Sequence, residues 1–150
     1  MSYENEVGQL VAVDVALESM RDSGYDLATA VGEVVDNSIE AKARNIKIHT
    51  GFVKGKTKEI TEIAFSDDGL GISPDILQHV LTLGYSTRYN QRNSLGRFGM
   101  GLKLAGISHA RRIDLYTRQE GGELYHTYID LAEIAEHKQT YIDKQIVENY

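Results

Sequence analysis

The sequence predicts an α+β fold, a two-layer sandwich in which a mixed, mostly antiparallel sheet carries helices on one face. Helical periodicity dominates the chain before Asn45. Strand-like pairs follow within residues 45–66 and within residues 112–130, with helical segments between them. Because strands and helices do not alternate one by one, a doubly wound parallel sheet is disfavoured.

The composition fits a single domain over residues 1–150, since a chain of 150 residues can bury its own core. Hydrophobic residues make up 41% and charged residues 25%, as in ordinary globular domains. No apolar run reaches the roughly 20 residues of a membrane span, and the N-terminus lacks the pattern of a signal peptide. The absence of cysteine excludes a disulfide framework and a thiolate metal site. We therefore expect a cytoplasmic, intracellular protein with no membrane partner.

Two helices are predicted first. Apolar residues at helical spacing indicate one from Gln9 to Arg21, which ends at Asp22-Ser23-Gly24. A second is predicted from Asp26 to Ala43, with Asp26 as its N-cap. The apolar arc of this second helix should face the core and consists of Leu27, Ala30, Val31, Val34, Val35, Ile39 and Ala41.

A hairpin, a capped helix and a long loop follow. Strands are predicted from Asn45 to Val53 and from Glu59 to Ser66, joined by a turn at residues 54–56. Ser73 and Pro74 indicate the start of a helix that runs to about Leu83. Residues 84–98 are polar and lack periodicity, and a loop of this length in a compact domain is usually functional. We interpret it as a lid.

The C-terminal part contains a helix, a second hairpin and a further short helix. The predicted ranges are a helix at Gly99–Ser108, strands at Arg112–Arg118 and Glu123–Asp130 around Gly121-Gly122, and a helix at Leu131–His137. The remaining tail includes a strand-like stretch.

The polar side of the second helix carries a candidate catalytic pair. Glu33 and Asn37 are four residues apart, so their side chains emerge next to each other. A glutamate can take a proton from water, and an asparagine oxygen can bind a hard metal ion. The alternative is an ordinary surface helix, which has the same polar and apolar pattern.

Two glycine-rich segments add candidate binding sites. Asp67-x-Gly69-x-Gly71 ends a strand, and an acceptor-only carboxylate there suits an exocyclic amine such as that of adenine. Residues 96–103, which read GRFGMGLK, open a helix and so resemble an anion site built from backbone N–H groups. This loop fits neither the P-loop nor the dinucleotide pattern. An Asp-Gly turn without a ligand remains the alternative for the first segment.

The distribution of charge favours an anionic ligand. The net charge of −6 argues against broad nucleic-acid binding by this segment itself. From Ile76 to Ile113, however, the chain has no acidic residue. A solvated basic loop is the alternative to a ligand site there. The basic residues of this span are Arg88, Arg92, Arg97, Lys103, Arg111 and Arg112.

Taken together, the motifs resemble those of the GHKL superfamily, which comprises the ATP-binding domains of gyrase B, heat-shock chaperones, histidine kinases and MutL. GEVVDNSIEA is similar to its N-box, SDDGLGIS to its first glycine box and LGRFGMGLKLA to its second. With LTLGYST, the set is most similar to the microrchidia-like (MORC) branch. The resemblance covers residues 27–107 and implies the Bergerat ATP-binding fold.

The resemblance implies a role for each matched position. Glu33 would be the general base, Asn37 would coordinate Mg²⁺, and Asp67 would accept a hydrogen bond from the adenine amine. Gly71 would let the base sit close, with Gly69 beside it and Ala41 lining the adenine pocket. The second box and the lid would contact the phosphates through Ser86, Thr87, Gly96, Arg97, Phe98, Gly99, Met100, Gly101, Leu102 and Lys103. Asp36 and Glu40 are expected to be solvated or to support the groups that touch the ligand, since the resemblance fixes their role less.

The implied function is binding of ATP with Mg²⁺ and its hydrolysis to ADP and phosphate. In the full protein, ATP would close the lid and promote a homodimer, and nucleic acid would be contacted only through other domains. Hydrolysing relatives usually borrow a lysine from a second, C-terminal domain and carry further strands. We therefore expect either a fold truncated at its C-terminus or a minimal version of it, in which nucleotide binding is expected and turnover by this segment alone is not implied. The alternatives are a nucleotide-responsive binding module without significant turnover and a histidine-kinase catalytic domain. The Glu33-x-x-x-Asn37 arrangement is more typical of the hydrolases, so we expect the histidine-kinase alternative to be wrong.

Overall fold

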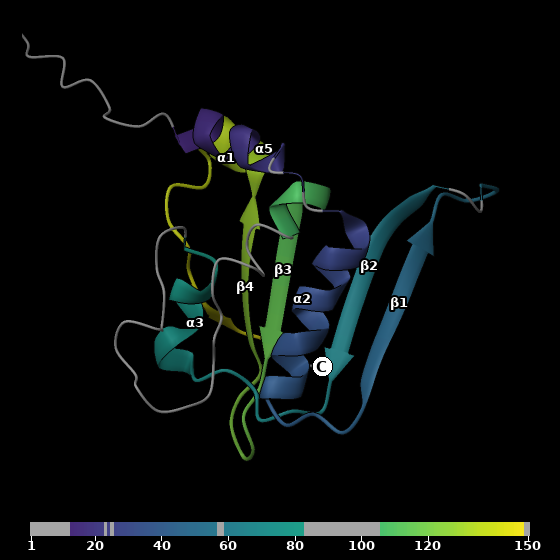
Figure 1. Ribbon diagram of the computed structural model, residues 1–150. Helices are drawn as coiled ribbons and strands as arrows, with labels where there is room; N and C mark the ends of the chain where they lie inside the picture. Colours follow the sequence, from purple (N-terminus) through teal and green to yellow (C-terminus); the bar gives the residue numbers. More distant parts are fainter. Residues whose placement is uncertain (1–12, 23, 25, 57–58, 83–105, 149–150) are drawn as a thin grey trace, which may run out of the picture.

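The computed structural model describes residues 13–22, 24, 26–56, 59–82 and 106–148 (Figure 1). Its helices and antiparallel strands confirm the α+β class predicted from the sequence. The helices are α1 (Val13–Arg21), α2 (Leu27–Glu40), α3 (Pro74–Val80) and α5 (Leu131–Ala135), and residues 106–109 are also helical. The strands are β1 (Ile46–Phe52), β2 (Ile60–Asp67), β3 (Arg112–Thr117), β4 (Tyr125–Asp130) and β5 (Gln145–Ile146).

The described strands form two antiparallel sheets, where the sequence led us to expect one mixed sheet. In the first sheet β1 pairs with β2, and in the second the order is β3-β4-β5. Figure 1 shows β2 and β3 running in the same direction and converging on a common corner at their C-terminal ends. At that corner the backbone N–H of Ile72 donates to Thr117 Oγ1 at 2.8 Å. The hydroxyl of Thr117 therefore accepts from the backbone N–H of Ile72, where a continuous sheet would offer a backbone carbonyl of the neighbouring strand.

Helix α2 is capped at both ends by local sequence signals. The Asp26 carboxylate accepts from the N–H of Thr29 at 2.6 Å, which confirms the predicted N-cap. At the other end Lys42 is left-handed, with φ +64°. The N–H of Ala43 donates to Ser38 O and that of Lys42 to Ile39 O, which is the Schellman pattern. The helix therefore ends at Glu40 rather than at the predicted Ala43.

The buried face of α2 is rotated from the apolar arc that the sequence predicted. Ala30 and Ser38 are buried and Val34 is half-buried, so this stripe faces inward. Leu27 and Ile39, which were expected in the core, are 41% and 57% exposed. The stripe contains a serine because Ser38 has a hydrogen-bond partner on β2, described below.

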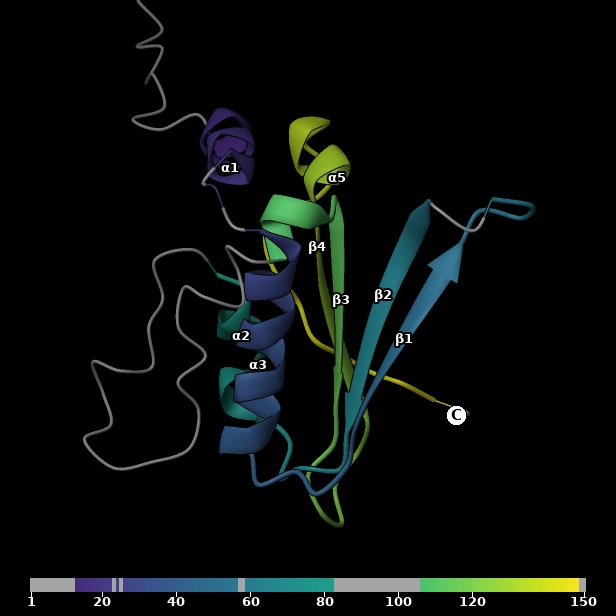
Figure 2. The same cartoon turned by 45° about the vertical axis from the view of Figure 1, so that its right-hand side comes forward.

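Two apolar clusters hold the helices against the second sheet. Ile72, Leu77 and Val80 bring α3 and the segment before it onto Leu115 and Tyr125 of β3 and β4. A second cluster joins α1, α5 and residues 106–109 and comprises Leu17, Ile107 and Leu131, with Ile113 and Ile134 packed against it. Figure 2 shows α2 and α3 together on one side of the strands, with α1 and α5 at one end. The predicted helix start at Ser73 is confirmed by its contact with the N–H of Asp75.

Some predicted elements fall outside the described residues, namely the start of the first helix, the lid over residues 84–98 and most of the helix predicted from Gly99. Within the described ranges, no helix is both long and apolar enough to cross a bilayer.

Candidate functional site

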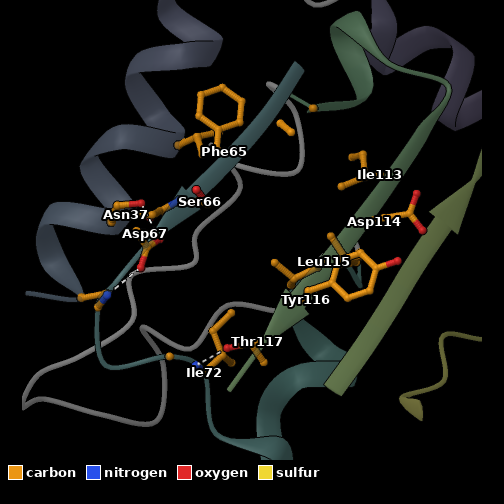
Figure 3. Close-up of a pocket in the computed structure, with 18 of the residues that line it drawn as sticks. Asn37, Phe65, Ser66, Asp67, Ile72, Ile113, Asp114, Leu115, Tyr116 and Thr117 are labelled. Carbon is orange, nitrogen blue, oxygen red and sulfur yellow. Dashed lines mark hydrogen bonds between the residues drawn. The ribbon is translucent and has the colours of Figure 1, made fainter. Parts of the chain in front are cut away.

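The candidate site is built where α2 ends and β2 ends. Asp67 is the last residue of β2, and its Oδ2 accepts a hydrogen bond from Ser38 Oγ at 2.7 Å. Its Oδ1 accepts from the N–H of Gly69 at 2.9 Å. The carboxylate is thereby held in one orientation although the residue is exposed (Figure 3). Since a carboxylate has about four acceptor positions, it can still accept from a ligand amine.

Ser38 belongs to the candidate site and was not identified by the sequence analysis. The residue is only 4% exposed, and its hydroxyl donates to Asp67, the acidic residue predicted to bind the purine. The sequence offered one available signal, because Ser38 follows the predicted metal ligand Asn37 and sits one helical turn after the apolar Val34.

The glycines of the first box are required by close contacts within the protein. A Cβ at Gly69 would lie 2.8 Å from Ala41 O, and the neighbouring Leu70 N–H donates to that oxygen at 2.8 Å. Gly71 has φ +73°, and a Cβ there would lie 2.3 Å from Arg118 O. The sequence analysis expected Gly71 to make room for a base, and packing against Arg118 is a second requirement for glycine at this position.

Asp68 connects the end of β2 to the segment between α2 and β1. Its Oδ1 accepts from the N–H groups of Arg44 and Asn45 at 2.7 and 2.8 Å, and its Oδ2 accepts from Asn45 Nδ2 at 2.8 Å. The Asn45 side chain, followed by these backbone groups, lowers the pKa of Asp68 to about 2. The carboxylate therefore stays ionised in neutral solution.

A cleft of about 2550 Å³ lies among α2, β2 and β3. It exceeds the roughly 300–1,000 Å³ of a typical small-molecule site, because it includes the space between the diverging sheets. Glu33 is half-buried on α2 but is not among the described residues that line this cleft. The predicted site residues that do line it are Asn37, Ala41, Asp67, Gly69 and Gly71.

The remaining predicted contacts lie outside the described residues. They are the lid and second-box positions Ser86, Thr87, Gly96, Arg97, Phe98, Gly99, Met100, Gly101, Leu102 and Lys103.

The donor set of the cleft fits a magnesium ion that arrives with a phosphate ligand. Within the described ranges, no three acidic, histidine or cysteine side chains gather into a metal cage. Mg²⁺ seldom needs one, since it keeps several waters and takes its other ligands from one or two protein groups and substrate phosphates. The carboxamide oxygen of Asn37 is a hard donor that suits this role.

A polar cluster occupies the face of β3 and β4 that points away from the core. Arg112 Nε and Nη2 donate to Asp114 at 2.8 and 3.0 Å, and the guanidinium lies 4.2 Å from the centre of the Tyr128 ring. His126 Nε2 lies 2.8 Å from Asp114 Oδ1, and Tyr128 donates to Glu133 at 2.8 Å. The bond from Arg112 lowers the pKa of Asp114. This cluster stabilises the second hairpin and was not predicted.

Sequence comparison identifies the class of protein. Residues 25–150 match the family described as histidine kinase-, DNA gyrase B-, and HSP90-like ATPase. The chain belongs to this family, and the GHKL assignment made from the sequence motifs is confirmed.

Individual relatives come from the MORC and MutL groups. The chain is 32% identical to ATPase morc-1 of Caenorhabditis elegans over 93 residues, which is 62% of this chain and 10% of that protein. It is 31% identical to the DNA mismatch repair protein MutL of Syntrophomonas wolfei over 107 residues, or 69% of this chain and 18% of that protein. For Protein MICRORCHIDIA 3 of Arabidopsis thaliana the identity is 29% over 100 residues, which is 63% of this chain and 16% of that protein. The matches thus take in 18% or less of these three relatives.

Proposed function

We propose that this domain binds ATP together with Mg²⁺ in the cleft beside α2 and hydrolyses it to ADP and phosphate. The observation that carries the proposal is the orientation of Asp67, whose two oxygens are held by Ser38 and by the N–H of Gly69. A carboxylate held in this way presents acceptors to the adenine amine. Family membership supports a nucleotide as the ligand.

In this mechanism each residue of the chain has a separate task. Asp67 binds the purine, and the glycine-rich segment at residues 96–103 offers backbone N–H groups to the phosphates. Asn37 would hold Mg²⁺, which would neutralise charge on the phosphates when bound. Glu33 accepts the proton of the attacking water as its oxygen forms a bond to the terminal phosphorus. The bond from that phosphorus to the bridging oxygen breaks, and ADP leaves with the electron pair.

Calorimetric titration with ATP and Mg²⁺ tests the binding site, using Asp67→Asn as the variant. Both oxygens of Asp67 already accept protein donors, so the amide NH₂ would face either Ser38 or Gly69. We expect affinity to fall about tenfold to a hundredfold, the value of a hydrogen bond to a charged group. The exposed Asp36 of α2 provides the control, because Asp36→Asn removes the same charge away from the cleft. Equal affinity in Asp67→Asn and Asp36→Asn would remove Asp67 from the purine site.

A second candidate function is a nucleotide-responsive binding module without significant turnover. The position of Glu33 favours it, since Glu33 does not line the cleft among the described residues. Phosphate release by the wild type and by Glu33→Gln distinguishes the two. If the domain hydrolyses ATP, the wild type should release phosphate, and Glu33→Gln should bind ATP without releasing phosphate. Release at background level in both proteins, with binding intact, would favour the module.

Two further steps of the proposal concern the whole protein. ATP closes the segment at residues 84–98 over the nucleotide, and two copies then associate. Family membership supports these steps. Light scattering of the full-length protein with a non-hydrolysable ATP analogue should show a doubled mass. A mass that is unchanged at saturating nucleotide would rule out ATP-dependent dimerisation.

A further inference from the structure

Asp68 connects the two segments that carry the purine side of the candidate site. The segment from residue 41 to residue 45 links α2 to β1 and contains the left-handed Lys42. Asp68 accepts from Arg44 and Asn45 at the far end of this link, and its own N–H donates to Asn45 O at 3.3 Å. At the near end, the Leu70 N–H donates to Ala41 O at 2.8 Å. The first glycine box thus holds the link at both ends.

These hydrogen bonds determine how α2 and β2 lie relative to each other near the ligand. Ser38 and Ala41 stand on or just after the last turn of α2, and Asp67 immediately precedes Asp68. A shift of the link would therefore change the distance between Ser38 Oγ and the Asp67 carboxylate, which is 2.7 Å. Asp68 itself is exposed and belongs to neither apolar cluster, so its bonds serve the corner rather than the core.

We propose that Asp68 is a positioning residue that sets the orientation of Asp67 toward the purine through its hydrogen bonds to Arg44 and Asn45. The proposal rests on the proposed ATP-binding function and adds a residue that supports the selectivity of Asp67 for adenine. Asp68 does not touch the nucleotide. It keeps the α2–β1 link in place, and the link keeps Ser38 against Asp67.

Two variants separate this role from general stabilisation. Asp68→Ala removes every acceptor of the side chain. Asp68→Asn keeps one oxygen that can accept from both backbone N–H groups, Arg44 and Asn45, at the position of Oδ1. Binding is measured with ATP and with inosine triphosphate, which has a carbonyl in place of the adenine amine, at a temperature where circular dichroism shows each protein folded. Asp36→Asn is again the charge-matched control.

The expected result is a change in selectivity. Asp68→Ala should weaken ATP binding by about fivefold to tenfold, the range of one lost hydrogen bond, and leave inosine triphosphate nearly unaffected. Asp68→Asn should keep most of the preference for ATP. Amide hydrogen exchange without nucleotide should accelerate at residues 44 and 45 in Asp68→Ala and stay close to wild type in Asp68→Asn.

The outcomes that overturn the inference differ from those that overturn the function. An unchanged ratio of the two affinities in Asp68→Ala, or equal loss for both nucleotides, would reduce Asp68 to a structural residue while ATP binding stands. Failure of the wild type to bind either nucleotide would instead reject the proposed function, and the inference with it. Amide hydrogen exchange provides a test that does not depend on nucleotide binding. If the exchange rates of residues 44 and 45 are the same in Asp68→Ala as in the wild type, the positioning role is wrong.

Discussion

Replacing Ser38 with alanine tests whether the hydrogen bond from α2 to Asp67 of β2 orients the Asp67 carboxylate. Ser38 is 4% exposed, and its hydroxyl oxygen lies 2.7 Å from a carboxylate oxygen of Asp67. A buried hydrogen bond to a charged group contributes about 1.5–3 kcal/mol. Since Asp67 is exposed and water can replace the lost donor, we expect the free energy of unfolding to fall by about 1 kcal/mol, or about 2–4 °C in melting temperature for a domain of this size. Binding is a separate free energy. Because Ser38 orients the carboxylate of the proposed site, we expect the binding free energy to weaken by about 1 kcal/mol as well, or about fivefold in ATP affinity.

The assay is a double-mutant cycle on ATP affinity, measured for the wild type, Ser38→Ala, Asp67→Asn and both together. If Ser38 acts through Asp67, the double variant should bind about as weakly as Asp67→Asn alone. Ser19→Ala is the matched control, because Ser19 Oγ donates to Val15 O on the exposed side of α1 and the change raises helix propensity equally. Losses that add to within about 0.5 kcal/mol would refute the reasoning.

The remaining predictions concern stability and are read as urea midpoints or melting temperatures. Gly71→Ala should cost at least about 2 kcal/mol, because φ is +73° and the new Cβ would press on Arg118 O. Lys42→Gly should stabilise the domain by about 1 kcal/mol, since glycine adopts the left-handed conformation without strain. Arg112 lowers the pKa of Asp114 from its ordinary 3.8, so the folded state binds fewer protons than the unfolded chain. This contribution is fully present above pH 3.8 and is lost as the pH falls through the lowered pKa, so the stability gap between wild type and Asp114→Asn should narrow below that pH. If the stability difference between wild type and Asp114→Asn instead grows as the pH falls, the pKa of Asp114 is not lowered in the folded state.

Sequence reasoning succeeded where the signal is local. The cap at Asp26, the Ser73-Pro74 helix start and both hairpins depend on neighbouring residues, and all are present. The end of α2 was placed at Ala43, three residues too late, because nothing in a lysine indicates that Lys42 will adopt a left-handed conformation. Asn37 and Asp67, which the motifs assign to one site, line the same cleft, and their roles stay predictions.

Contacts between distant segments could not be predicted in the same way. Ser38 reads as one more polar residue on an amphipathic helix until its partner Asp67 is known. From the sequence, Asp68 looks like part of an Asp-Gly turn. Its carboxylate in fact accepts from Arg44 and Asn45, which precede β1 and lie 24 and 23 residues away in the sequence. The separation into two sheets depends on how strands distant in sequence pair, and periodicity carries no information about that.

The corner beside α2 has a consequence for how the domain can move. The hydrogen bonds that orient Asp67 and Asp68 all connect α2, β1 and β2 with the links between them. None of these bonds involves the β3-β4-β5 sheet, which meets the first glycine box through Thr117 and Arg118. A rotation of one sheet against the other would therefore leave the hydrogen bonds that orient Asp67 and Asp68 intact. If the proposed site is right, the width of the cleft can change without changing the groups that select the base.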